Sequence, residues 1–100
     1  MEKFVKFEIH DYMDMYPRFT VITFKGNNLD EIRANAISYA NHMNKNYSGG
    51  TTKFVKVMSA DEARKHVDSQ IAAITNPDAA DKLWFEEMNN LYNKCYSNSI

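Results

Sequence analysis

The three histidines are the side chains best suited to acid–base or metal chemistry, and they are far apart in the sequence. His10 is followed by Asp11 and Asp14, whereas His42 and His66 stand in separate segments. A histidine near a carboxylate can act as a general base or bind a metal. No HExxH, H-x-x-x-H or His–Cys spacing occurs, and no further oxygen ligands accompany His10 at the spacing of a cation site. We therefore expect no metal and no cofactor.

The other candidate reactive groups do not indicate catalysis either. Glu86 and Glu87 are adjacent on a predicted helix, so their carboxylates diverge by about 100° and do not form a working pair. Cys95 is the only cysteine; it falls on the apolar stripe of the same helix, where it is expected to be a small buried hydrophobe. Gly26 precedes a helix, but one glycine does not make a phosphate loop. These observations predict a protein that is not an enzyme.

A short connection rich in aromatic residues and methionine is the first candidate for recognition. It contains Tyr12, Met13, Met15 and Tyr16 and ends in a Tyr-Pro step that disfavours a helix. Methionine and tyrosine are enriched at protein–protein contacts because they offer large and adaptable surfaces. Two interpretations stand equally: these side chains bind a partner protein, or they cover the ends of the core.

A face of the predicted sheet is the second candidate. Alternation in the first and third strands places four residues together on the side away from the central helix, namely Phe4, Lys6, Phe54 and Lys56. Rings that stack with bases and lysines that meet phosphates are typical of single-stranded RNA binding. The pattern favours the opposing interpretation, in which the last helix covers this face as a second core layer.

The central helix is predicted from Asn28 to Tyr47, with Leu29, Ile32, Ala36 and Met43 recurring at three- and four-residue steps. Asn28 and Glu31 have the spacing of a capping box. The Ser48-Gly49-Gly50 segment is expected to end the helix through a left-handed glycine.

The remaining elements follow from alternation and capping signals. Strands are predicted at Lys3–His10, Arg18–Lys25 and Thr51–Met58. Ser59 and Glu62 form a capping box for a second helix. Asn76 as N-cap and Pro77 at the first position start a third helix, which ends in a frayed segment at residues 97–100. The order ββαβαα predicts an α+β class: a small three-stranded sheet with an antiparallel hairpin, packed against amphipathic helices.

Length and composition set the boundaries. One hundred residues predict a single domain, residues 1–100. Twelve basic and thirteen acidic side chains give a net charge of −1, which argues against a general binder of the phosphate backbone. The lone cysteine and the absence of a secretory signal or a long apolar run predict a cytoplasmic protein that does not cross a membrane.

Two resemblances can be stated. The strand pair followed by a Gly26-Asn27-Asn28 turn and a helix with Glu31 and Ala36 loosely resembles the small partial RNase-H-type antitoxin domains, although a third leading strand is missing here. The abundance of asparagine, lysine, tyrosine and methionine resembles that of small accessory proteins of AT-rich bacteriophages.

The functional expectation is a small protein-binding module, of the bacteriophage accessory type, that inhibits or modulates a host or defence protein by occupying its surface. The alternative is a single-stranded RNA-binding domain. A homodimer is also conceivable, because a small sheet with a free edge can pair with a copy of itself.

Overall fold

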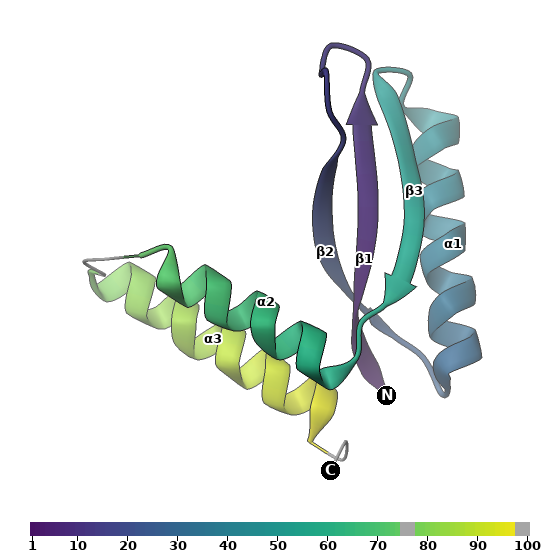
Figure 1. Ribbon diagram of the computed structural model, residues 1–100. Helices are drawn as coiled ribbons and strands as arrows, with labels where there is room; N and C mark the ends of the chain where they lie inside the picture. Colours follow the sequence, from purple (N-terminus) through teal and green to yellow (C-terminus); the bar gives the residue numbers. More distant parts are fainter. Residues whose placement is uncertain (75–77, 98–100) are drawn as a thin grey trace. The chain divides into compact units, whose positions relative to one another are not determined.

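The computed structural model describes residues 1–74 and 78–97 and confirms the α+β class with the order ββαβαα (Figure 1). The elements are β1 (Glu2–Asp11), β2 (Arg18–Lys25), α1 (Leu29–Asn46), β3 (Gly50–Val57), α2 (Ala60–Ala72) and α3 (Ala79–Tyr96). The chain forms two compact units, Met1–Val57 and Met58–Ile100. The division follows from which residues contact one another and does not show whether the two units fold separately. The single domain expected from the length therefore stays a prediction.

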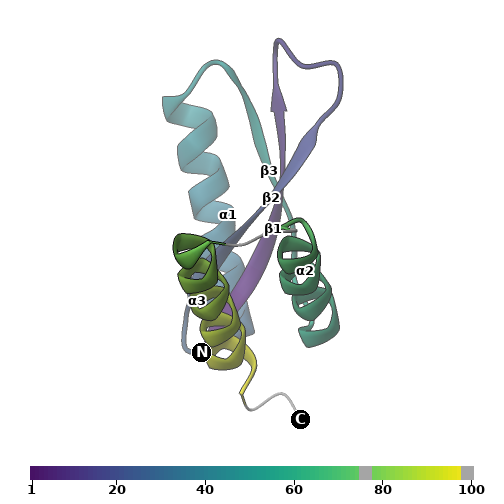
Figure 2. The same cartoon turned by 90° about the vertical axis from the view of Figure 1, so that its left-hand side faces the viewer.

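The first unit is a three-stranded sheet in the order β2-β1-β3 with α1 against one face (Figures 1 and 2). Both pairings of β1 are antiparallel, and Val5 lies opposite Ile22 on β2 and opposite Val57 on β3. The hairpin of β1 and β2 was predicted from the sequence and is confirmed.

The core of this unit lies between the sheet and α1. Its fully enclosed residues alternate on β1 and recur at four-residue steps on α1: Val5, Phe7, Ile32, Ala36 and Ala40. The Phe7 ring contacts the rings of Phe24, Tyr39 and Phe54 at centroid distances of 5.7, 5.2 and 6.4 Å. Tilted and edge-on pairs at these distances are favourable beyond their buried area. The small side chains of Ala36 and Ala40 let α1 pack closely against the sheet beside these rings.

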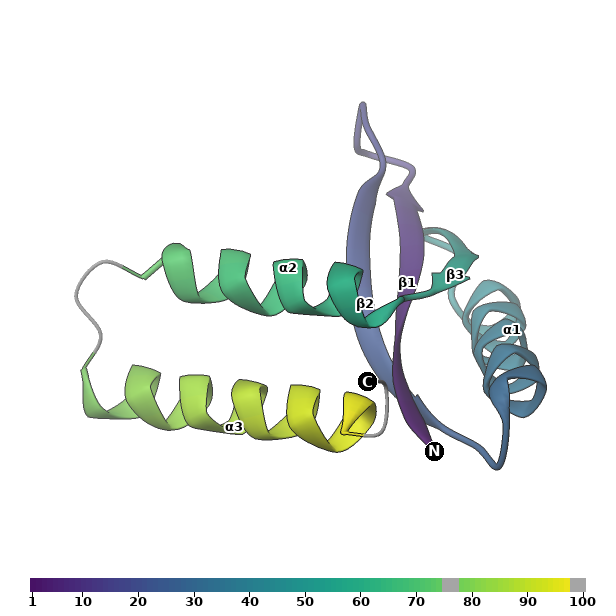
Figure 3. The ribbon, with the colours of Figure 1, turned by 60° about the horizontal axis from the view of Figure 1, so that its bottom comes forward.

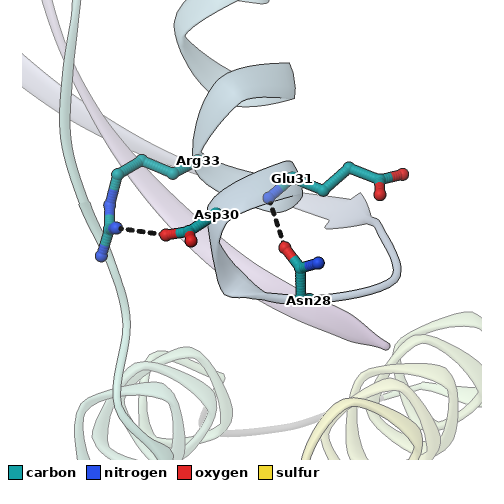
Figure 4. A network of polar contacts seen from close by, with 4 residues as sticks. All are labelled: Asn28, Asp30, Glu31 and Arg33. Carbon is teal, nitrogen blue, oxygen red and sulfur yellow. Dashed lines mark hydrogen bonds and ion pairs between the residues drawn. The ribbon is translucent and has the colours of Figure 1, made fainter.

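The N-terminus of α1 is capped by one half of the predicted box (Figure 4). The Asn28 side chain accepts a hydrogen bond from the Glu31 N–H at 2.8 Å. The Glu31 carboxylate instead accepts from the Asn27 side chain at 3.2 Å. Asp30 pairs with Arg33 at 3.4 Å on the exposed side of the same turn. The cap prediction is therefore confirmed for Asn28, with a different partner for the Glu31 carboxylate.

The predicted glycine ending of α1 is wrong. The helix ends at Tyr47 in an extended conformation, and all three glycines have negative or extended φ. Gly50 serves another purpose: a Cβ at this position would lie 2.6 Å from the His10 carbonyl oxygen and 2.8 Å from the Asp11 Cα. Glycine therefore permits the close approach of β3 to the end of β1.

A β-bulge changes which residues of β3 face the core. The register with β1 shifts between Lys6 and Phe7, so Lys6 lies opposite Lys56 while Phe7 lies opposite Phe54. The extra residue is Val55, which is 38% exposed, while Phe54 and Val57 both pack against the core. Simple alternation placed Val55 in the core and Phe54 on the opposite face, and both assignments are wrong because a bulge reverses the alternation.

The outer edge of β3 is covered at one point by a side chain from α1. Asn44 accepts from the Thr52 N–H at 2.7 Å and donates to the Thr52 carbonyl at 2.8 Å. One amide thus takes the place of a neighbouring strand at this residue.

The second unit is a pair of antiparallel helices (Figure 3). The predicted capping box of α2 is confirmed, because Ser59 accepts from the Glu62 N–H at 3.2 Å and the Glu62 carboxylate accepts from the Ser59 N–H at 3.3 Å. The N-cap of α3 is Asp78, which forms its own capping box with Asp81. The prediction of Asn76 as this cap is therefore wrong, and both Asn76 and Pro77 lie outside the described residues.

The two helices are joined by contacts near the start of α2. The Tyr96 hydroxyl donates to the Met58 carbonyl at 2.9 Å, and the Tyr92 and Tyr96 rings stack at 5.3 Å. Arg64 lies over the Tyr92 ring at 5.2 Å. Cys95 is buried, as predicted, whereas Leu83, near the start of the same helix, is exposed. Of the segment predicted to fray, residues 98–100 lie outside the described residues.

Candidate functional site

The connection between β1 and β2, residues 12–17, presents the most exposed large apolar side chains of the described chain; we call it the hairpin loop. Met13 is 95% exposed and Met15 is 86% exposed. Tyr12 and Tyr16 are exposed by more than two thirds. The sequence allowed two interpretations of this loop. The interpretation in which its side chains cover the ends of the core does not fit, because these side chains are exposed to solvent.

The base of the hairpin loop is held by several polar contacts. The Tyr12 N–H donates to the Gly49 carbonyl at 3.0 Å, and the Asp14 N–H donates to the Asp11 carbonyl at 3.0 Å. His10 Nε2 donates to the Asp14 carbonyl at 3.2 Å. The Arg18 guanidinium pairs with the Asp11 carboxylate at 3.3 Å across the base. These contacts fix the ends of the loop, so its apolar tip is presented from a defined backbone.

A hollow of about 540 Å³ lies beside the base of the loop. It is bounded by the ends of β1 and α1 and the start of β3, and the residues lining it include Ile9, Arg18, Met43, Tyr47 and Thr52. Asp11 lines it too, and a side chain at Gly50 would crowd it, because a Cβ there would lie 2.9 Å from the Asp11 Oδ1. The hollow mixes one ion pair with both polar and apolar side chains, and it adds concave surface next to the exposed loop.

The four residues of the predicted RNA-binding face are not on one face. Lys6 and Lys56 lie opposite each other on the side away from α1, whereas Phe54 packs into the core on the other side. Phe4 is on the same side as Lys6 but is only 3% exposed. The shared face predicted for Phe4, Lys6, Phe54 and Lys56 is therefore wrong as a geometric statement.

The exposed ring beside Lys6 is Phe19, which was not assigned to a face of the sheet from the sequence. Phe19 of β2 is 57% exposed, and the Lys6 Nζ lies 4.4 Å from its ring centroid. Because β2 is apolar on both faces, its sequence did not show which of its rings would be open. The pairing of Glu8 with Phe19 across the hairpin settles the face.

The three histidines lie on separate elements, β1, α1 and α2. No group of three or more histidine, cysteine, aspartate or glutamate side chains within residues 1–74 and 78–97 could hold a metal ion. His10 is bound to the loop backbone, and His42 lies beside the Asn46 amide at 3.0 Å on α1. Burial lowers the pKa of His66 on α2 below its ordinary value of 6.5.

Comparisons with protein-family models, with curated proteins and with solved structures found no match to this chain. Within the part of the chain that the structure describes, none of the helices is both long and apolar enough to span a membrane. The function of this chain is therefore inferred from the geometry of the surfaces described above.

Proposed function

We propose that this protein is a non-enzymatic protein-binding module whose hairpin loop occupies the surface of a partner protein. The observation that carries the proposal is the exposure of Tyr12, Met13, Met15 and Tyr16 on a loop with a fixed base. A folded protein gains nothing in stability from apolar side chains held in water, and clustered ones mark interaction surfaces. The cluster therefore supports binding better than a structural role.

The chemistry of the loop favours a protein over other ligands. Tyrosine offers a flat apolar ring with a polar end, and methionine adapts its unbranched side chain to the shape of a partner. The loop carries one charged side chain, Asp14, which is negative and would repel phosphate groups. The hollow beside the loop gives a protruding partner side chain a place to enter.

Binding by occupation implies that the protein acts as an inhibitor or modulator. The composition typical of bacteriophage accessory proteins supports a host or defence protein as the class of target. In this proposal the first unit supplies the recognition surface, because the hairpin loop belongs to its sheet.

The test is capture of a partner from a host lysate on the tagged protein after nuclease treatment. The triple variant Tyr12→Ser, Met13→Ser and Tyr16→Ser should lose a stoichiometric protein band that the unchanged protein retains. A matched control replaces two exposed apolar residues that lie outside both the loop and the hollow, Leu29→Ser and Leu83→Ser, and should retain it. Thermal unfolding of both variants should match that of the unchanged protein. Equal capture by the triple variant would refute the role of the loop.

Single-stranded RNA binding is the second candidate, and a specific observation favours it. Lys6 over the exposed Phe19 ring, with Lys56 opposite Lys6, offers a stacking surface next to two ammonium groups. Binding should weaken steeply with salt, and Phe19→Ala should cost about 1–3 kcal/mol of binding free energy. Absence of binding to mixed-sequence RNA at low salt would rule this candidate out.

A further inference from the structure

The outer edge of β2 carries backbone groups whose direction can be assigned from the hydrogen bonds. The Gly26 N–H donates to the Met1 carbonyl at 3.0 Å, so these two residues form a hydrogen-bonded antiparallel pair. Such pairs alternate with non-hydrogen-bonded pairs along a ladder. In the register of β1 and β2, every second residue of β2 therefore turns its N–H and C=O away from β1. These residues are Phe19, Val21, Thr23 and Lys25.

One of the outward groups is already used. The Lys25 carbonyl accepts a hydrogen bond from the Asn35 side chain of α1 at 3.1 Å. The sheet ends at β2, and no hydrogen bond from the described residues reaches the outward groups of Phe19, Val21 or Thr23. The N–H and C=O of these three residues, six backbone groups, thus form the open middle of this edge, which contains no proline.

The opposite edge of the sheet is treated differently. The bond from the Tyr12 N–H to the Gly49 carbonyl sets the alternation on β3 and turns the Thr52 groups outward. Both of these groups are bonded to the Asn44 amide. The β3 edge is therefore covered at Thr52 by a side chain, while the groups of Phe19, Val21 and Thr23 on the β2 edge are open, and an open edge can take up another strand.

We propose that the open edge of β2 binds β2 of a second copy of this chain, antiparallel and with Val21 on the two-fold axis. In this register Val21 lies opposite Val21 of the second copy, and Phe19 lies opposite Thr23 of the second copy. Each of these pairs exchanges two hydrogen bonds, so all six open groups of both copies are used. The result is a continuous six-stranded sheet in the order β3-β1-β2-β2-β1-β3.

The ends of the edge select this register. The next pair outward joins Pro17 of one copy to Lys25 of the other. Proline has no N–H, so it cannot donate to the Lys25 carbonyl of the other copy. That carbonyl already accepts a hydrogen bond from Asn35. A shift of the register by two residues places either Pro17 opposite Thr23 or Lys25 opposite Phe19. In the first case the Thr23 carbonyl has no donor, and in the second the carbonyl facing the Phe19 N–H is already bonded to Asn35. The edge is complementary to itself in one register.

The side chains fit this arrangement. A two-fold axis perpendicular to the sheet keeps corresponding faces on the same side, so Val21 meets Val21 and Thr20 meets Ile22 of the second copy. Pairs of β-branched residues across strands are favourable. The contact is isologous and therefore closes at two copies. It uses the edge of β2 rather than the hairpin loop, so it stands or falls independently of the proposed partner.

The first measurement is the molar mass in solution by light scattering or sedimentation, up to sub-millimolar concentration. The expected mass is twice the 11.6 kDa of the chain. Val21→Pro removes the central donor without removing a bond to β1, because the Val21 N–H faces outward, and edge strands tolerate proline there. It should give the monomer mass, whereas Val21→Ala, which keeps the N–H, should remain a dimer. Circular dichroism should show the same secondary structure in both variants.

The register is tested by cysteine cross-linking in a Cys95→Ala background that has kept the mass of the unchanged protein. Cα atoms of a hydrogen-bonded antiparallel pair are about 5.5 Å apart, within the range of a disulfide. Val21→Cys should therefore cross-link to a dimer under mild oxidation, and Thr23→Cys, whose counterpart is four residues away along the strand, should not.

Three results would overturn the proposal. The unchanged protein could be a monomer throughout the concentration range, or Val21→Pro could retain the dimer mass. A dimer that cross-links through Thr23→Cys and not through Val21→Cys would place the contact elsewhere. If Val21→Pro fails to fold, the cross-linking pair alone decides between these outcomes.

Discussion

The bulge in β3 can be tested by mutation, because the structure and simple strand alternation predict different effects for two neighbouring residues. Phe54 and Val55 are neighbours in the chain, and alternation and structure assign them opposite environments. In the structure Phe54 packs against Phe7 and the core cluster, while Val55 is 38% exposed. Phe54→Ala should therefore destabilise the sheet unit, and Val55→Ala should change it little.

The magnitudes follow from burial. Complete removal of a buried phenylalanine ring costs about 3–5 kcal/mol, and Phe54 is only partly buried, so a loss of about 2 kcal/mol is expected. An exposed valine away from such contacts changes the free energy of unfolding by about 0.5 kcal/mol or less. With a urea dependence of about 1–2 kcal/mol per molar for a small unit, Phe54→Ala should lower the midpoint by about 1–2 M.

The assay is equilibrium unfolding in urea, followed by circular dichroism. Trp84 is the only tryptophan and lies in α3, so its fluorescence follows the second unit and serves as an internal reference. The reasoning would be refuted if Val55→Ala lowered the midpoint as much as Phe54→Ala, because that result would place Val55 in the core and remove the bulge.

Three further changes test separate contacts. Asn44→Ala removes both hydrogen bonds to Thr52 and should lower the free energy of unfolding by about 1–2 kcal/mol, so an unchanged urea midpoint would contradict it. Gly50→Ala places a methyl group 2.6 Å from a carbonyl oxygen of β1 and should cost about 1–3 kcal/mol, whereas Gly49→Ala, with open space around it, should be nearly neutral; equal effects would contradict this. Stability should decrease as pH falls below 6.5, because burial lowers the pKa of His66 in the folded state and the unfolded state takes up the proton first. His66→Gln should flatten that part of the plot of melting temperature against pH, and an unchanged plot would exclude His66 as the cause.

Features that depend on neighbouring residues were predictable from the sequence. The order of elements follows from alternation, helical periodicity and caps, and Asn28, Ser59 and Glu62 act as their spacing indicates. The N-cap of α3 was misplaced because several consecutive residues could start a helix there, and the sequence does not rank a cap at Asn76 above one at Asp78.

Features that depend on pairing between distant segments were not predictable in the same way. Nothing in Thr51–Val57 marks Val55 as an extra residue; the bulge appears only when β3 is set against Lys6 and Phe7 of β1. The candidate loop was identified by composition alone, but the same composition is compatible with side chains that cover a core. Its exposure is a property of how the hairpin ends beyond the sheet.

The Asn44 amide on Thr52 also has a consequence for how many neighbours one molecule can take. A sheet with two open edges is divalent and can grow into a fibre, whereas a sheet with one open edge is monovalent and stops at a pair. By occupying both outward groups of Thr52, Asn44 limits growth from the β3 side. The same side chain that adds two hydrogen bonds to the fold would then act as a chain terminator for assembly, and its loss would favour insoluble polymer over the closed dimer.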